Sequence, residues 1–351
     1  MLFDLITSMK AMAGICHGNC FSGQCATIGK EIGYIELKSI GLFFNNDRLK
    51  QKFARKREQM DCSKSGGACA SGDCEASGAG SRESLEGNNN QLQERLGKIK
   101  HKILILSGKG GVGKSTVAAN VACSLALKNF RTGLLDVDFH GPSIPTLLKL
   151  EGQAVYSGPG GLVPIDYSQH LKVMSLGFLL KNQDDAVIWR GPVKMQVMKQ
   201  MLEDVLWGAL DYLVMDFPPG TGDEPLSMSQ LIPDADGAII VTTPQDLSLN
   251  DVRKSINFCH KVKIPVLGVV ENMSGFTCPH CQGIVDVFKR GGGEAMANRM
   301  GVPFLGRIPM TTLIVEASDD GHPFVEKQPD AEVSRMFACM VDDLVGKING
   351  N

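Results

Sequence analysis

The stretch Gly108-Lys-Gly-Gly-Val-Gly-Lys-Ser115 decides how this chain folds. It satisfies the pattern G-x-x-x-x-G-K-S/T, which is typical of a phosphate-binding loop. It follows the apolar run Ile103–Leu106 and precedes the segment Val117–Ala126, whose composition favours a helix. A strand, a glycine-rich loop and a helix in that order bring backbone N–H groups and a helix N-terminus to one phosphate. The sequence therefore predicts an α/β domain that binds a phosphorylated ligand at this loop.

The residue types of the loop suit a nucleotide with several phosphates. Glycines have no Cβ and adopt positive φ, so the backbone can wrap closely around a phosphate. Lys114 is placed to reach the β- and γ-phosphates, and the hydroxyl of Ser115 is placed to bind Mg²⁺. We expect the ATP-binding residues of this segment to be Gly108, Lys109, Gly110, Gly111, Val112, Gly113, Lys114, Ser115 and Thr116.

Short apolar runs recur along the chain after the loop, with helical patterns between them. Continuous apolar runs are typical of strands that are buried on both faces. Alternating strands and helices predict a doubly wound, mostly parallel α/β sheet, with ligands at the carboxyl ends of its strands. The expected strands are Ile103–Leu106, Thr132–Leu135, Leu171–Ser175, Tyr212–Met215, Gly237–Thr242 and Val266–Glu271.

The composition of the 351-residue chain, 43% hydrophobic and 21% charged, is that of a soluble globular protein. A formal net charge of -2 gives no general attraction to nucleic acid or to anionic membranes. The chain has no apolar run of the roughly 18 residues that a membrane span needs, and no signal-peptide pattern. We expect a cytoplasmic protein with no nucleic-acid or membrane partner. In the reducing cytoplasm, eleven cysteines indicate metal or redox chemistry rather than disulfides.

Composition also divides the chain into three regions. Residues 1–60 contain three cysteines and a basic stretch, and we interpret them as an extension of uncertain order. Residues 61–97 are rich in Gly, Ser, Ala and Asn, which is typical of a flexible linker, here with further cysteines. Residues 98–351 carry the alternating pattern and form the nucleotide-binding domain.

Acidic residues follow two of the expected strands. Asp136 and Asp138 are two residues apart, so on an extended strand they share one side. Asp216 follows four hydrophobic residues, which is the Walker B arrangement. In that arrangement the carboxylate holds Mg²⁺, directly or through water, opposite Ser115. The prolines and glycines after Asp216 predict a loop able to sense the γ-phosphate.

Lys109, directly after the first glycine, adds a second lysine to the loop. With it the loop resembles the deviant Walker A class of dimeric ATPases. The resemblance implies a homodimer in which Lys109 reaches the nucleotide of the other copy. It also implies that Asp138 orients the attacking water and that Asp136 lies nearer the Mg²⁺ shell. Asn272, after the last expected strand, resembles the adenine-reading asparagine of this class; a strand-end turn is the simpler alternative.

Three sequence motifs indicate a particular group within this class of ATPases. They are His140-Gly-Pro-Ser-Ile-Pro145, Asp216-Phe-Pro-Pro-Gly-Thr-Gly-Asp223 and Cys278-Pro-His-Cys281. Together they resemble the Mrp/ApbC group of iron–sulfur cluster carrier ATPases over roughly residues 98–345. The resemblance implies a homodimer that binds a 4Fe–4S cluster, hydrolyses ATP slowly and passes the cluster to apo iron–sulfur proteins.

Cys278 and Cys281 are spaced so that both sulfurs can bind one metal centre. A tetrahedral zinc or a four-iron cluster takes four thiolates, and a two-fold axis between two copies supplies the second pair. We therefore interpret the pair as half of a bridging site. Thiolates bind zinc as well as iron, and only the family resemblance favours the cluster. A thioredoxin-like redox pair is the alternative, although such a pair usually precedes a helix N-terminus.

Cys62, Cys69 and Cys74 form a second cysteine group with six and four residues between its members. Some eukaryotic relatives carry a four-cysteine, ferredoxin-like motif in their extension, but this spacing departs from it and a local fourth cysteine is missing. Cysteine-rich tails of shorter prokaryotic relatives fit the group better. We keep it as a possible second metal site.

Two other ATPase functions compete with the carrier. A partition or septum-site ATPase of the membrane-binding kind ends in a basic amphipathic helix, whereas the last helix here has the pattern of one that packs on a core. A targeting ATPase with a dimer-bridging zinc would want a long methionine-rich insertion for its client. The small stripe Met195, Met198 and Met201 is more typical of a core.

Overall fold

The computed structural model describes residues 92–139, 141–179, 191–278, 281 and 283–350. Within these residues the chain forms an eight-stranded sheet with the strand order β12-β9-β8-β1-β7-β2-β6-β5. Neighbouring strands run parallel except β5 and β6, which are antiparallel at one edge. This is the doubly wound, mostly parallel sheet that the sequence predicts.

The strands of the large sheet alternate along the chain with helices. The strands are β1 (Ile99–Ser107), β2 (Thr132–Asp136), β5 (Ile165–Ser168), β6 (Leu171–Ser175), β7 (Leu210–Asp216), β8 (Gly237–Thr242), β9 (Val266–Glu271) and β12 (Phe304–Arg307). Two small hairpins pair β3 (Ser157–Gly158) with β4 (Gly161–Leu162) and β10 (Phe276–Thr277) with β11 (Ile284–Val285). The helices are α5 (Lys114–Leu127), α6 (Ile144–Leu147), the 3-10 helix η2 (Leu176–Leu179), α7 (Gly191–Glu203), α8 (Asp223–Leu231), α9 (Asp246–Val262), α10 (Gly292–Met300), α11 (Thr312–Asp319), α12 (Phe324–Lys327) and α13 (Glu332–Asn349).

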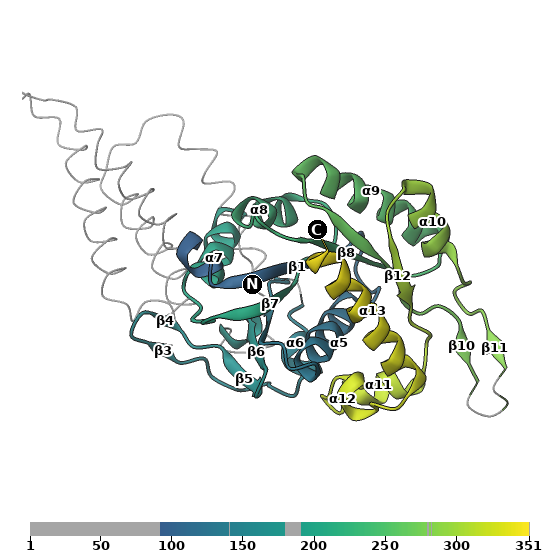
Figure 1. The fold of residues 1–351 in the computed structure, drawn as a ribbon, viewed down its shortest axis with the longest axis horizontal. Coiled ribbons are helices and arrows are strands. Elements are labelled where there is room, and N and C mark those ends of the chain that lie inside the picture. The colour runs from purple at the N-terminus through teal and green to yellow at the C-terminus, as the bar shows by residue number, and fades with distance from the viewer. Residues whose placement is uncertain (1–91, 140, 180–190, 279–280, 282, 351) are drawn as a thin grey trace, which may run out of the picture. The chain divides into compact units, whose positions relative to one another are not determined.

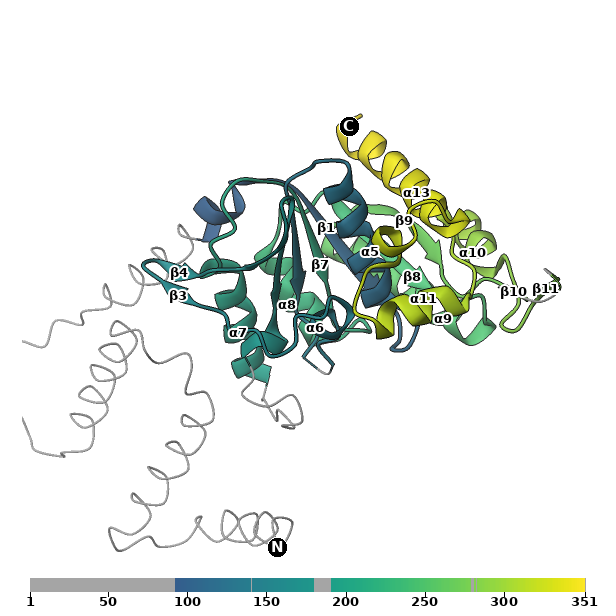
Figure 2. The ribbon, with the colours of Figure 1, turned by 90° about the horizontal axis from the view of Figure 1, so that it is seen from below.

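The helices lie in two layers, one on each face of the sheet. Helices α7, α8, α9 and α10 cover one face, and α5 and α13 cover the other (Figures 1 and 2). Helix α5 is buried on almost every side, because it lies against the sheet and also contacts α12 and α13. Its alanine-rich sequence, which has no polar face, follows from that position.

The observed strand bounds follow the apolar runs closely. Strands β6, β8 and β9 coincide with the predicted segments. Strand β1 begins at Ile99, earlier than predicted. The predicted segment started after Lys102, whose charge interrupts the apolar run. In the structure Lys102 is buried within the strand, and its ammonium group pairs with Asp234 at 2.8 Å. The edge strands β5 and β12 were not predicted, since they are only four residues long and partly exposed.

The packed part of the chain begins before β1. Residues 92–96 are helical, and both Leu92 and Leu96 belong to the hydrophobic core. The guanidinium group of Arg95 donates to the carbonyl of Gly160 at 2.6 Å. The composition-based boundary at residue 97 therefore falls after the first packed turn of the domain. The other proposed boundary, at residue 60, lies outside the described residues.

Helix α13 packs its apolar face on α5, α12 and β12, as the sequence predicts. The buried apolar residues are Val333, Phe337, Met340, Val341, Leu344 and Ile348, whereas Met336 is half-buried. On α7, Met198 and Met201 are buried, and Met195 is exposed. In the part of the chain that the structure describes, no helix has both the length and the apolar character to cross a membrane.

Replacing Leu344 with alanine should destabilise the domain, because this side chain is fully buried between α13 and the rest of the core. The expected loss in the free energy of unfolding is about 2–5 kcal/mol. Asp343→Ala is the matched control, since Asp343 lies exposed on the same helix. Urea unfolding followed by circular dichroism measures both; equal stabilities would contradict the packing of α13.

Candidate nucleotide site and cysteine hairpin

Polar residues gather at the carboxyl edge of the sheet. Strands β7 and β8 flank β1, so the chain passes from one side of β1 to the other at this point. In open α/β sheets a ligand binds where the strand order reverses in this way. The last residues of six strands are Ser107 (β1), Asp136 (β2), Ser175 (β6), Asp216 (β7), Thr242 (β8) and Glu271 (β9).

The phosphate-binding loop connects β1 to α5 at this edge. Gly111 and Gly113 have φ values of 78° and 81°, in the left-handed region that favours glycine. No side chain among the described residues caps the N-terminus of α5. The first backbone N–H groups of α5 are therefore available to an anion, and the helix dipole adds to the attraction.

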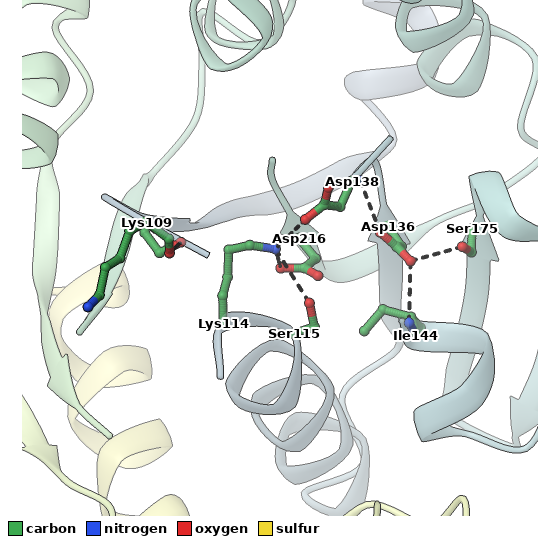
Figure 3. Close-up of polar contacts among 9 residues, drawn as sticks. Lys109, Lys114, Ser115, Asp136, Asp138, Ile144, Ser175 and Asp216 are labelled. Carbon is green, nitrogen blue, oxygen red and sulfur yellow. Dashed lines mark hydrogen bonds and ion pairs between the residues drawn. The ribbon is translucent and has the colours of Figure 1, made fainter. Parts of the chain in front are cut away.

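Lys114, the first residue of α5, lies between two carboxylates. Its Nζ is 2.5 Å from Oδ1 of Asp216 and 3.5 Å from Oδ2 of Asp138 (Figure 3). Lys114 is 6% exposed and Asp216 is fully buried. Three residues that the sequence assigned separately, from the loop, the end of β7 and the segment after β2, thus lie in one cluster.

The carboxylates of this cluster outnumber the nearby ammonium group. Burial raises the pKa of Asp216, and the adjacent Lys114 ammonium opposes that rise. Burial and then the charge of Asp216 raise the pKa of Asp136. The second oxygen of Asp216, Oδ2, is buried and accepts no hydrogen bond from the described residues. A carboxylate oxygen left in this way beside a serine hydroxyl suits a hard divalent cation such as Mg²⁺.

Asp136 is held by the chain itself. Its Oδ1 accepts from the backbone N–H of Asp138 at 3.0 Å, and its Oδ2 accepts from the Ser175 hydroxyl at 2.9 Å and the Ile144 N–H at 3.4 Å. These contacts fix the segment that follows β2 and thereby orient Asp138 toward Lys114. The assignment of Asp136 to the Mg²⁺ shell stays a prediction.

Lys109 points away from the cluster of its own chain. Figure 3 shows its side chain turned from Lys114 and Asp216. Its backbone carbonyl accepts from the Ser107 hydroxyl at 3.0 Å, which fixes the start of the loop. A role for Lys109 at the nucleotide of another copy stays a prediction.

Asn272 contacts the phosphate-binding loop from the end of β9. Its Nδ2 donates to the carbonyl of Val112 at 2.9 Å, and its side chain is almost fully buried. This contact lies against the backbone of Gly113, because a Cβ on Gly113 would be 2.2 Å from the same nitrogen. Asn272 therefore supports the loop, and its contact with adenine stays a prediction.

Sequence reasoning missed two contacts around this cluster. Ser175, which holds Asp136, ends a strand that was predicted, but no pattern marks its hydroxyl as functional. Lys194 on α7 pairs with Glu224 on α8 at 2.5 Å, and its ammonium lies 5.8 Å from the centroid of the Phe139 ring. This pair ties the segment after β2 to the helix after β7, and its residues are too far apart in sequence to form a motif.

Cys278 and Cys281 lie in the loop of the hairpin formed by β10 and β11. The hairpin extends from the body of the domain beside α10 (Figure 1). The backbone N–H of Cys278 donates to the carbonyl of Gly283 at 2.9 Å. Cys278 is half-buried, Cys281 is exposed, and neither forms a disulfide. The pair thus follows a strand in a hairpin, not at the helix N-terminus expected for a thioredoxin-like pair.

The described part of one copy supplies few further ligands beside this pair. Within the described ranges, no group of three or more His, Cys, Asp or Glu side chains is placed to hold a metal ion. The hairpin instead presents three exposed apolar side chains next to the cysteines: Ile284, Val285 and Val287. The candidate group Cys62, Cys69 and Cys74 lies outside the described residues.

The other described cysteines differ from this pair. Cys123 and Cys259 are buried, and burial raises the pKa of each thiol to about 12. Cys339 is exposed on α13. It lies on the side of the helix opposite the core, a position that helical periodicity indicates.

The sheet, the loop and the Lys114–Asp216 cluster define a P-loop nucleoside triphosphatase. A family model described as ParA, the NUBPL iron-transfer P-loop NTPase, matches residues 98–345. The chain belongs to this family of iron-transfer P-loop NTPases, which confirms the resemblance seen in its motifs.

Individual relatives agree with the family. The chain is similar to an iron-sulfur cluster carrier protein of Methanocaldococcus jannaschii, 51% identical over 260 residues, 74% of this chain and 89% of that protein. It is also 51% identical to the cytosolic Fe-S cluster assembly factor CFD1 of Eremothecium gossypii over 263 residues, 72% of this chain and 94% of that protein. A solved nucleotide-binding protein from Archaeoglobus fulgidus, in complex with ADP, is 37% identical with a TM-score of 0.61, covering 71% of this chain and 96% of that one.

Gly113→Ala should weaken both folding and nucleotide binding. The added Cβ meets the Asn272 amide, and the φ of 81° is unfavourable for alanine. We expect a loss of about 1–3 kcal/mol in the free energy of unfolding. Gly346→Ala, in an open position on α13, is the control and should be neutral or stabilising. Thermal unfolding with and without ADP measures both effects; wild-type behaviour of Gly113→Ala would contradict the described loop.

The cysteines should differ widely in reactivity at pH 8. Since the thiolate is the nucleophile, Cys123 and Cys259, whose pKa values are raised to about 12, should stay unmodified by iodoacetamide in the folded protein. They become reactive only as the pH rises toward 12 or the chain unfolds. Cys281 and Cys339, which are exposed, should react. Peptide mass spectrometry measures each site, and modification of Cys123 as fast as Cys281 would contradict the burial.

Proposed function

We propose that this protein is an ATP-dependent iron–sulfur cluster carrier. In this proposal two copies hold one 4Fe–4S cluster between them, hydrolyse ATP slowly and pass the cluster to apo iron–sulfur proteins. The observation that carries it is the position of Cys278 and Cys281 in an exposed hairpin, where one copy offers two thiols. The names of the relatives support the cargo, because one is called a carrier of iron–sulfur clusters and another a factor in their assembly.

The homodimer follows from the number of ligands. A four-iron cluster takes four thiolates, and a two-fold axis beside the hairpin gives two from each copy. The exposed side chains of Ile284, Val285 and Val287 favour association at this face, since burying apolar surface is favourable. A cluster held by two copies is bound only while the copies stay together, so any change in their arrangement can release it.

The nucleotide site provides the means for such a change. Lys114 would bind the β- and γ-phosphates, and Ser115 and Asp216 would hold Mg²⁺, which neutralises charge on the phosphates. Asp138, whose carboxylate lies 3.5 Å from the Lys114 ammonium, would orient the attacking water. Lys109, turned away from its own site, would reach the nucleotide of the second copy. Catalysis of this kind rests on positioning and charge neutralisation, and the slow rate in the proposal rests on the resemblance to the carrier ATPases.

The alternatives predict other features. A membrane-binding septum-site ATPase would end in a basic amphipathic helix, whereas α13 packs on the core with its apolar face. A zinc-bridged targeting ATPase would use the same cysteine pair, so the metal content separates it from the carrier. We also propose that the carrier works in the cytoplasm and that Cys62, Cys69 and Cys74 contribute to a second metal site.

Anaerobic reconstitution with iron and sulfide tests the carrier. We expect about four iron and four sulfide ions per two chains, with a broad absorbance near 400 nm. The variant with Cys278→Ala and Cys281→Ala should lose this cluster. Cys339→Ala is the matched control, because it removes an exposed thiol far along the chain and should keep the cluster.

Each result has a distinct meaning. Iron that survives the double substitution would belong to a second site among the first 91 residues or to another cysteine. Stoichiometric zinc without iron–sulfur absorbance would favour the targeting ATPase. A wild-type protein that binds neither metal would refute the carrier and leave only the nucleotide-dependent ATPase.

A further inference from the structure

Two adjacent residues at the end of β9 contact two different functional parts of the molecule. Glu271 is fully buried, and Asn272 is 8% exposed. Adjacent side chains of an extended chain point in opposite directions. Here one of them contacts the phosphate-binding loop and the other contacts the cysteine hairpin.

Asn272 holds the phosphate-binding loop at its centre. Its Nδ2 donates to the carbonyl of Val112, and its own backbone N–H donates to the carbonyl of Thr242 at 2.7 Å. The backbone of Gly113 lies directly against the Asn272 amide, so a shift of the loop moves or breaks this contact. The position of Asn272 therefore depends on the position of the loop.

Glu271 closes the base of the cysteine hairpin. Its Oε1 accepts from the Ser274 hydroxyl at 2.5 Å and from the Gly291 N–H at 2.8 Å. Its Oε2 accepts from the Gly293 N–H at 2.5 Å. Ser274 precedes the hairpin, whereas Gly291 and Gly293 follow it. One carboxylate therefore holds both ends of the segment that carries the cysteine pair.

The N-terminus of α10 and the guanidinium group of Arg307 both lie against the Glu271 carboxylate. Gly291 is the N-cap of α10, so the carboxylate lies at a helix N-terminus, where the dipole attracts negative charge. The Nε atom of Arg307 is 3.6 Å from Oε1. Hydrogen bonds to a charged, buried acceptor are stronger than neutral ones, so the base of the hairpin is held firmly.

We propose that Glu271 is the positioning residue of the cysteine pair and that, together with Asn272, it links the phosphate-binding loop to the hairpin. A nucleotide that shifts the loop then shifts the ends of the hairpin, and with them the exposure of Cys278 and Cys281. By linkage, if the nucleotide changes the affinity of the cysteines for a metal by some factor, the bound metal changes the affinity for the nucleotide by that same factor. The proposal rests on the proposed carrier function for what the cysteines hold, but the link belongs to the metal-free chain.

The test uses metal-free, full-length protein and measures the rate of iodoacetamide modification at the cysteine pair. Trypsin gives a peptide from Ile264 to Lys289 that contains Cys278 and Cys281 but no other cysteine. Rates are compared with and without saturating Mg-ADP. We expect ADP to change the rate in the wild type by about fivefold or more, a typical size for coupling between sites.

Glu271→Gln should remove this response. Glutamine keeps the shape of the side chain, but its amide nitrogen cannot accept a hydrogen bond and faces the N–H group of either Gly291 or Gly293, so one of these contacts is lost and the hairpin base is loosened. The modification rate should rise without nucleotide and respond little to ADP. Glu294→Gln is the matched control, because Glu294 pairs with the same Arg307 without contacting the hairpin ends. It should behave as the wild type.

A second, milder variant keeps the test decisive if Glu271→Gln folds poorly. Ser274→Ala removes only the hydroxyl contact and should give a response between wild type and Glu271→Gln. An ADP response that is absent in the wild type, or equal in wild type and Ser274→Ala or Glu271→Gln, would overturn the link. Because no cluster is involved, a normal response with failed reconstitution would refute the carrier and leave the link standing.

Discussion

The buried pair of Lys114 and Asp216 is the interaction on which the site depends. An ammonium group at the start of α5 and a carboxylate at the end of β7 lie 2.5 Å apart, in a region that solvent hardly reaches. Each charge is tolerated there because the other is present, and removal of either would leave a costly unpaired charge. The pair thus fixes the lysine where phosphates are expected. It also leaves one oxygen of Asp216 for a cation.

The carboxyl edge of the sheet extends this arrangement outward. Asp136 orients Asp138 on one side of the pair, and Asn272 supports the loop on the other. Glu271, one residue before Asn272, holds the cysteine hairpin. Parallel strands bring these residues to one edge, so the phosphate-binding loop and the base of the cysteine hairpin are held by the adjacent residues Asn272 and Glu271.

Local patterns in the sequence predicted six strands of the large sheet, the phosphate-binding loop and the acidic strand ends, because each depends on neighbouring residues. That Asp216 and Lys114 lie together could be predicted only because both belong to known nucleotide-binding motifs. The contacts of Asn272 with Val112 and of Glu271 with Gly293 join segments far apart in sequence, and no local pattern contains them. Glu271 did carry a signal, since an acidic residue ends its strand as Asp136 ends β2. The predicted start of β1 was too late because Lys102 was read as the end of the apolar run. Its burial depends on a partner far away in the sequence, Asp234.

The central claim is that one cluster is shared by two copies through Cys278 and Cys281. Native mass spectrometry of reconstituted protein tests it most directly, with wild type mixed with a mass-tagged variant that carries Cys278→Ala and Cys281→Ala. The account predicts a 4Fe–4S mass on dimers of two wild-type chains and none on mixed dimers or single chains. A full cluster on single chains, or on mixed dimers as often as on wild-type dimers, would contradict it.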